Sequence, residues 1–185
     1  MKKVLIILVL LIAGFVIYGA TLGLFEKVVV NVTKVGPYKF VYAEHKGSYM
    51  KVGKVMNNIF KSLDKDFGIK AERGFGVYYD NPKLVKKENL RSSVGCVLES
   101  EYFDDEDKIK TKFGIMEYPV TQSITAEFPY KNMGSIIVAV AKVYPEFSKY
   151  MEANGFEQTE SLEIYSMKDK KIFFSMPLKK KQGAQ

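Results

Sequence analysis

The sequence predicts an α+β fold in which two βαββ units form one antiparallel sheet, with both helices on one face and an apolar helix in front. An internal repeat is the first observation behind this prediction, because Ala43 and Met50 recur 83 positions later as Ala126 and Met133. The second is the order of periodicities in each half, which is a strand, an amphipathic helix and two further strands. Two such units would pack as a sheet layer and a helix layer.

Residues 1–25 are predicted to be a single-pass transmembrane anchor. Residues 4–25 carry no charge, and about 22 helical residues span a hydrocarbon core of about 30 Å. A cleaved secretory signal is the alternative, but its apolar core is shorter and ends at a small-residue site that does not match here. Lysines on both sides of the segment leave open which side of the membrane the domain occupies.

Residues 26–178 are predicted to form one domain, with repeats at about 28–99 and 113–178 and a basic tail at 179–185. In the first repeat a helix begins near Ser48 and ends at Gly68, followed by strands at 74–80 and 92–98. Its apolar stripe contains Val52, Val55, Met56, Ile59, Phe60 and Leu63.

The second repeat has a matching helix, in which Pro145 is expected to introduce a kink or start a new helix. Its predicted apolar stripe contains Met133, Ile136, Ile137, Val140 and Val143. Strands are expected at 161–167 and 171–178. The acidic run 104–107 between the repeats lacks the spacing of a calcium loop and is predicted to be a surface loop.

Composition excludes several classes of function. The net charge of +7 comes from lysines spread along the chain among acidic residues, so no nucleic-acid partner is expected. Cys96 is the only cysteine, which excludes an internal disulfide, and it is predicted to be a buried strand residue. His45 is the only histidine and is expected to make a structural hydrogen bond. We therefore expect no metal site and no cofactor.

Four short strings carry a family resemblance. "AEHKGSY" at 43–49, "YYDNP" at 78–82, "FPY" at 128–130 and "LEIY" at 162–165 occur in this order. Together they resemble the GyrI-like small-molecule-binding domains, which include the effector domains of AraC-type regulators. They also resemble a membrane-anchored branch of this family, which contains the testis-expressed ER-phagy receptor of animals. The autophagy-binding tail of that receptor has no counterpart here, so its role is not carried over.

The alternation of side chains in the strand at 161–167 predicts towards which face of the sheet the candidate site residues point. Side chains alternate along a strand, so Leu162 and Ile164 share one face while Glu163 and Tyr165 share the other. We expect the apolar pair to face the helices, which would turn Glu163 towards the opposite, concave face. The repeat places Gly76 at the equivalent position, and a glycine there would leave room for a ligand.

The resemblance implies that Glu163 is the buried anionic anchor of an aromatic pocket. Tyr42, Tyr78 and Tyr165 are the predicted wall residues, because aromatic faces attract cations and flat apolar groups. The alternative is that these tyrosines cover an exposed sheet face and that Glu163 is solvated.

These observations favour a membrane-tethered module that binds a small hydrophobic or cationic molecule. A second hypothesis is a hydrolase of the GyrI-like cyclopropanoid type, with Glu163 as general base and Tyr165 as polarising donor. A third is a membrane-anchored adaptor that binds a protein partner and no ligand. A binding role is favoured over an enzymatic one.

Overall fold

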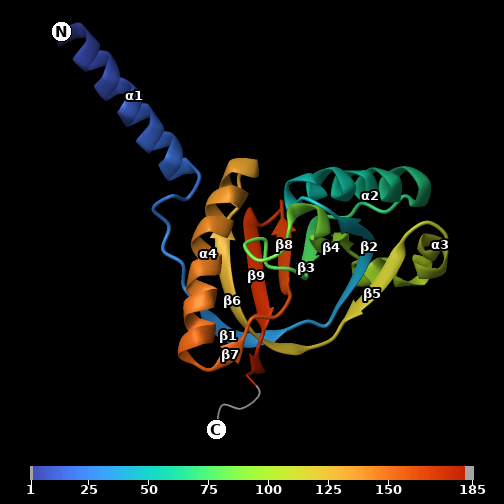
Figure 1. Ribbon diagram of the computed structural model, residues 1–185. Coiled ribbons are helices and arrows are strands. Elements are labelled where there is room, and N and C mark those ends of the chain that lie inside the picture. Colours follow the sequence, from blue (N-terminus) through green and yellow to red (C-terminus); the bar gives the residue numbers. More distant parts are fainter. Residues whose placement is uncertain (1, 182–185) are drawn as a thin grey trace.

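Figure 1 shows the computed structural model of the chain, which describes residues 2–181. These residues contain four α-helices and ten strands. The helices are α1 (Lys2–Thr21), α2 (Val52–Phe67), α3 (Glu106–Lys110) and α4 (Met133–Ala153). The strands are β1 (Asn31–Val35), β2 (Tyr38–Lys46), β3 (Arg73–Tyr78), β4 (Arg91–Val97), β5 (Gly114–Tyr118), β6 (Thr121–Pro129), β7 (Phe156–Glu157), β8 (Ser161–Ser166), β9 (Lys171–Pro177) and β10 (Lys179–Lys180). The predicted α+β class with one antiparallel sheet is confirmed.

Eight strands form the main sheet in the order β1-β6-β9-β8-β3-β4-β2-β5. This order is palindromic for the two repeats, because exchanging the halves reverses it. The sheet therefore has a pseudo-twofold axis between β3 and β8. Each repeat supplies one of these two central strands, so any site at the axis is built by both halves.

Each repeat contains one strand more than the sequence pattern predicted. Strand β1 precedes β2 but pairs with β6 of the second half, and β5 precedes β6 but pairs with β2 of the first half. The two strands lie 83 positions apart, the same spacing as the repeat itself. Each half thus gives its first strand to the edge of the other half, which joins the halves through backbone hydrogen bonds at both sheet edges.

Helix α2 follows its prediction closely. Ser48 caps the turn before it by accepting a hydrogen bond from the Met50 amide, and Gly68 ends it with a φ of 70°. Val52, Ile59 and Leu63 are buried against the sheet. Because apolar residues recur at helical spacing on this side, the predicted apolar stripe is the face of α2 that packs on the sheet.

Helix α4 differs from its prediction in two ways. It is one helix from Met133 to Ala153, so Pro145 does not start a new helix, and its buried face is rotated from the expected one. Its buried residues are Ser135, Ala139, Val143, Phe147 and Met151. Met133, Ile137 and Val140 are exposed instead. Small residues at 135 and 139 let the helix approach the sheet closely, and the more hydrophobic neighbours face outward.

Both large helices lie on one face of the sheet, α2 over the first half and α4 over the second (Figure 1). The other face is concave, since residues from edge and central strands meet on it. Phe40 of β2 stacks on Phe75 of β3 with ring centroids 3.9 Å apart, and Tyr118 of β5 lies 6.1 Å from Phe40. Leu162 and Ile164 belong to the same concave-face core.

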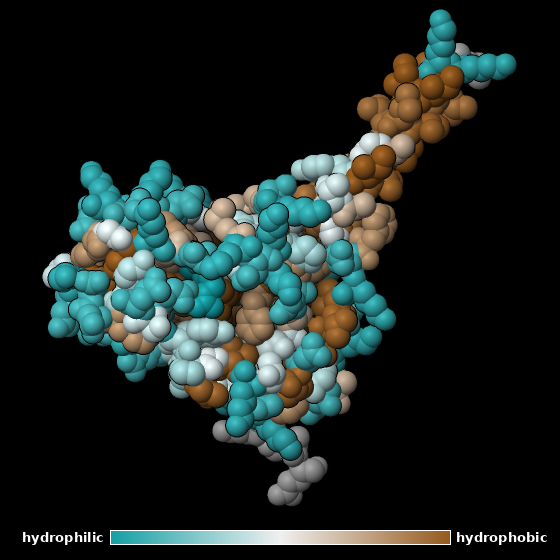
Figure 2. All heavy atoms as spheres, turned by 180° about the vertical axis from the view of Figure 1, so that it is seen from behind, coloured by the Kyte–Doolittle hydropathy of each residue, from teal (hydrophilic) through white to brown (hydrophobic). Residues whose placement is uncertain are grey.

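Helix α1 extends away from the domain, and Figure 2 shows it as hydrophobic along nearly its whole length. It is long and apolar enough to cross a membrane, a property that signal sequences share. At the other end of the chain, β10 pairs with β7, so the predicted basic tail begins as a short strand. Residues 182–185 of that tail lie outside the described residues.

The acidic run between the repeats is not a loop. Residues 100–105 form a 3-10 helix that leads into α3. Glu106 pairs with Lys39 and Lys110, and Asp105 pairs with Lys108. Two of the four acidic residues at 104–107 are therefore paired with lysines. Cys96 is fully buried in β4, as predicted.

Candidate functional site

The candidate site lies at the pseudo-twofold axis, where β3 and β8 run side by side. Gly76 is directly opposite Glu163 in the antiparallel register, and Gly74 is opposite Tyr165. Since residues two apart share a face, all four positions look to the same side of the sheet.

That side faces the helices, so the expected orientation of β8 is wrong. A Cβ placed on Gly74 would lie 2.7 Å from Met56 Sδ of α2, and Tyr144 of α4 reaches Glu163 directly. Leu162 lies on the concave face instead. All six residues of β8 are buried, so the apolar side chains of this strand did not mark which face the helices cover.

Glu163 is buried, with 3 % of its surface exposed, and both carboxylate oxygens accept hydrogen bonds. Tyr144 Oη donates to Oε1 at 2.6 Å, and Tyr165 Oη donates to Oε2 at 2.5 Å. Each phenol has one proton, so the next partner in line must donate to it. Ser161 Oγ therefore donates to Tyr144 Oη at 2.7 Å, and Tyr78 Oη donates to Tyr165 Oη at 2.9 Å.

The hydrogen-bond network therefore has two arms that end on one carboxylate. One arm runs from Tyr78 through Tyr165, and the other runs from Ser161 through Tyr144. Tyr49, just before α2, packs its ring edge-on to that of Tyr78 at 4.8 Å. Aromatic rings from both repeats thus surround the carboxylate, which is buried rather than solvated as the alternative interpretation proposed.

Burial governs the protonation of this cluster. Removal from water raises the pKa of Glu163, because the charged form loses hydration, while the hydrogen bonds from Tyr144 and Tyr165 act in the opposite direction. Burial and the neighbouring Glu163 charge raise the pKa values of Tyr144 and Tyr165 well above their ordinary range. The phenols consequently remain hydrogen-bond donors at neutral pH.

No lysine or arginine within residues 2–181 forms an ion pair with Glu163. A buried carboxylate is ordinarily paired with a cation or protonated. Here its partners are neutral hydroxyl groups. Among the described residues, the carboxyl group of Glu163 is thus held by hydrogen bonds from two phenols and by no cation.

The space above the central glycines is occupied by side chains of the site. A Cβ on Gly76 would lie 2.8 Å from the ring of Tyr78, which folds back over the glycine. Met56 similarly covers Gly74. The room expected opposite Glu163 is thus filled by Tyr78, and a ligand would have to displace that ring.

Three of the four predicted site residues are brought together and one is not. Glu163, Tyr165 and Tyr78 form the network, whereas Tyr42 packs with the concave-face core on the other side of the sheet. The ring of Tyr42 covers Gly114 of β5, where a Cβ would come within 2.5 Å. The side of the sheet on which Tyr42 lies depends on the register of β2, which the sequence pattern did not fix.

Sequence reasoning missed Tyr144 and Met56, which approach the site from the helices. Tyr144 follows Met133, Ile137 and Val140 at helical spacing, so it is the one polar tip in an apolar stripe of α4. That interruption is the signal that could have identified it.

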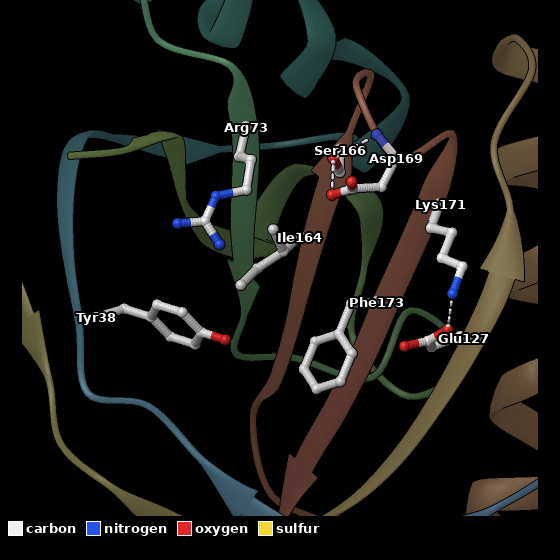
Figure 3. A pocket seen from close by; sticks show the side chains of 8 residues that line it. All are labelled: Tyr38, Arg73, Glu127, Ile164, Ser166, Asp169, Lys171 and Phe173. Carbon is white, nitrogen blue, oxygen red and sulfur yellow. Dashed lines mark hydrogen bonds and ion pairs between the residues drawn. The ribbon is translucent and has the colours of Figure 1, made fainter. Parts of the chain in front are cut away.

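A separate hollow of about 420 Å³ lies on the concave face and is drawn in Figure 3. Tyr38, Ile164 and Phe173 provide its apolar lining. Lys171 contacts Glu127 at 2.6 Å, and Arg73 makes a two-pronged bond outside the hollow to Glu99. Asp169 accepts a hydrogen bond from Ser166 Oγ at 2.7 Å and has no ion-pair partner among the described residues. The hollow is on the opposite side of the sheet from Glu163.

The arrangement around Glu163 can bind a cation, because it combines a buried carboxylate with aromatic rings. Cation–π attraction contributes about 0.5–2 kcal/mol for each ring. A carboxylate beside phenols could also activate water, but both of its oxygens are already engaged. The geometry favours binding over catalysis.

The sequence matches the GyrI-like small molecule binding domain family over residues 29–171. It is 31 % identical to human testis-expressed protein 264 over 147 residues, which is 76 % of this chain and 43 % of that protein. The mouse homologue is 33 % identical over 147 residues and is covered to 44 %. The chain therefore spans less than half the length of these relatives.

Solved structures agree in fold. The EcmrR C-terminal domain superposes with a TM-score of 0.58 at 11 % identity, covering 83 % of this chain and 99 % of that one. SAV2435 bound to tetraphenylphosphonium has a TM-score of 0.55 at 9 % identity, covering 82 % of this chain and 94 % of that one. With the sequence match over most of the domain, these likenesses lead to one conclusion: the chain belongs to the GyrI-like small molecule binding domain family.

Proposed function

We propose that this chain is a membrane-tethered binding module that takes up a small hydrophobic or cationic molecule beside Glu163. The observation that carries the proposal is the buried carboxylate that has only hydroxyl partners within residues 2–181. Family membership supports small-molecule binding, and a lipophilic cation bound to SAV2435 supports the ligand class. Helix α1 would anchor the module in the membrane.

In this proposal Glu163 supplies the negative charge, and Tyr78 and Tyr165 supply aromatic walls. Tyr144 holds the carboxylate in place from α4. A ligand would enter between α2 and α4 and displace the Tyr78 ring from Gly76. Tyr42 takes no part, because it lies on the concave face.

Tetraphenylphosphonium is a suitable probe, titrated by calorimetry into the full chain in neutral-lipid nanodiscs, with empty discs subtracted. Saturable binding to the wild type is expected, and Glu163→Gln should raise Kd by about 10–100-fold, since a charged contact is worth about 1.5–3 kcal/mol. Glu117→Gln, at a side chain that is 80 % exposed, is the matched control and should leave Kd unchanged.

The pH dependence offers a second readout. Because burial raises the pKa of Glu163, cation affinity should increase as the pH rises through that pKa and the carboxylate becomes charged. Equal Kd values for wild type and Glu163→Gln would reject the carboxylate anchor. An absence of saturable binding by the wild type would reject the cationic ligand class.

A further inference from the structure

Six large apolar side chains are exposed at the end of the domain next to α1. They are Leu24, Phe25, Met50, Met133, Ile137 and Val140, with exposed fractions from 38 to 67 %. We call this set the apical surface. Exposed apolar residues scattered singly need no explanation, but a contiguous patch marks an interaction site.

The apical surface is contiguous because the beginnings of α2 and α4 meet there. A Cβ on Gly53 of α2 would lie 3.8 Å from Met133 Cε, so the two helix starts are in contact range. Met50 precedes Gly53 by three residues. On the other side of α4, a Cβ on Gly134 would lie 3.1 Å from the Leu22 side chain.

The segment that joins α1 to the domain is tied down. Lys142 Nζ donates to the carbonyl oxygens of Leu24, at 2.7 Å, and of Glu26. Gly23 lies against the ring of Phe128, where an added Cβ would come within 2.7 Å. The end of α1 is thereby held beside the first turns of α4, as Figure 1 shows. A bilayer that contained α1 would begin at this end of the domain.

The charge around the apical surface is mainly positive, although the exposed Glu26 directly follows Phe25. Residues 45–63 and 128–145 contain six lysines and no acidic residue. These lysines are Lys46, Lys51, Lys54, Lys61, Lys131 and Lys142. The amino ends of α2 and α4 add the positive ends of two helix dipoles. Lysines around exposed apolar side chains are the combination that binds an anionic membrane surface.

We infer that the apical surface lies against a bilayer containing anionic lipid, with Met133 and Ile137 among the acyl chains and the lysines at the headgroups. This inference rests on the proposed anchorage by α1. It also relates the membrane to the site, because Met133, Ile137, Val140 and Tyr144 form one stripe along α4 that ends at Glu163. A membrane-partitioned amphiphile would then reach the carboxylate along this stripe.

Depth-dependent quenching can test the inference on the full chain in nanodiscs of phosphatidylcholine with phosphatidylserine. An environment-sensitive fluorophore is attached to Met133→Cys, to Ile137→Cys or to the control Val120→Cys, which is 52 % exposed in the wild type. Val120 directly precedes β6, and the other end of β6 leads into the start of α4. Because the nine residues of β6 span about 30 Å, Val120 lies about 30 Å from the apical surface. Cys96 is buried with a pKa raised to about 12, and the unsubstituted chain provides the labelling blank.

Lipids with a spin label in the upper acyl chain should quench the fluorophores at 133 and 137 several-fold more than the one at 120. In discs with phosphatidylserine, combined Lys51→Gln and Lys54→Gln should reduce quenching at 137. The pair Lys34→Gln and Lys180→Gln, at the far end of the sheet, should not reduce it.

Equal quenching at 137 and 120 in a chain that remains in the discs would overturn the inference and leave the tether and the cation site standing. A chain that does not stay with the lipid would overturn both the inference and the proposed anchorage. In either case Glu163→Gln should still bind tetraphenylphosphonium more weakly than the wild type does. Failure of this inference can therefore be distinguished from failure of the proposed binding site.

Discussion

At the middle of the sheet the first half of the domain contributes Gly76 and the second half contributes Glu163, directly opposed across the pseudo-twofold axis. Around them the halves are alike, because Tyr78 and Tyr165 are equivalent residues whose hydroxyl groups meet at 2.9 Å. The duplicated backbone supplies the geometry, and glutamate in place of glycine puts a carboxyl group on one side and leaves space for the Tyr78 ring on the other. A symmetric frame thus holds an asymmetric site.

The largest expected effect tests whether the two halves share one core. Phe75 and Leu162 are equivalent residues on the concave face, and both are almost fully buried. Phe75→Ala should lower the free energy of unfolding by about 3–5 kcal/mol and Leu162→Ala by about 2–5 kcal/mol, since each leaves a cavity. Urea denaturation of the full chain in detergent measures both.

Met167→Ala, at a side chain that is 71 % exposed, serves as the control and should change the free energy of unfolding by less than about 0.5 kcal/mol. If Leu162→Ala lowered the free energy of unfolding as little as Met167→Ala does, the second half would not depend on the shared core.

A smaller effect should separate the two equivalent tyrosines. Tyr165→Phe removes a hydrogen bond to a carboxylate and should destabilise the fold by about 1.5–3 kcal/mol, whereas Tyr78→Phe removes a bond between neutral groups and should cost about 0.5–1.5 kcal/mol. Thermal or urea unfolding of both variants gives the comparison.

Tyr42→Phe on the concave face is the control for this pair, with an expected change below about 0.5 kcal/mol. If Tyr78→Phe cost as much as Tyr165→Phe, the asymmetry assigned to Glu163 would be wrong.

The smallest effect is the pH dependence of stability that comes from Glu163, which stands where the first half has Gly76. The folded-state pKa of Glu163 is raised above the ordinary value of 4.5, so its contribution to stability is fully present below that value and declines as the pH rises through the folded pKa. Glu163→Gln lacks this dependence. The free energy of unfolding of Glu163→Gln should therefore increase relative to that of the wild type as the pH increases from about 4.5.

Urea denaturation between acidic and neutral pH measures this difference, with the exposed Glu117→Gln as a variant that should run parallel to the wild type. A free energy of unfolding of Glu163→Gln that falls relative to that of the wild type as the pH rises would mean that the folded pKa is lowered rather than raised.

Much of the fold could be predicted from local patterns. The repeat spacing of 83 residues identified β2 and β6 as equivalent strands, and the apolar stripe at helical spacing identified α2. In α4 the predicted stripe was right for Val143 and wrong for Ile137, which faces outward, and it missed Ser135 and Ala139, which face the sheet. Hydrophobicity alone misleads where a helix must approach a sheet closely, or where an apolar stripe serves another surface.

The sequence by itself determined the family, the duplication, the apolar N-terminal helix and the pairing of Glu163 and Tyr165 on one face of a strand. Those properties follow from residue spacing, and spacing is local. Only the tertiary structure decided that this face looks towards the helices, that Tyr144 completes the site and that Tyr42 lies elsewhere. A strand buried on both faces has no polar side to mark its orientation, and the exchange of β1 and β5 between halves depends on pairing between distant residues.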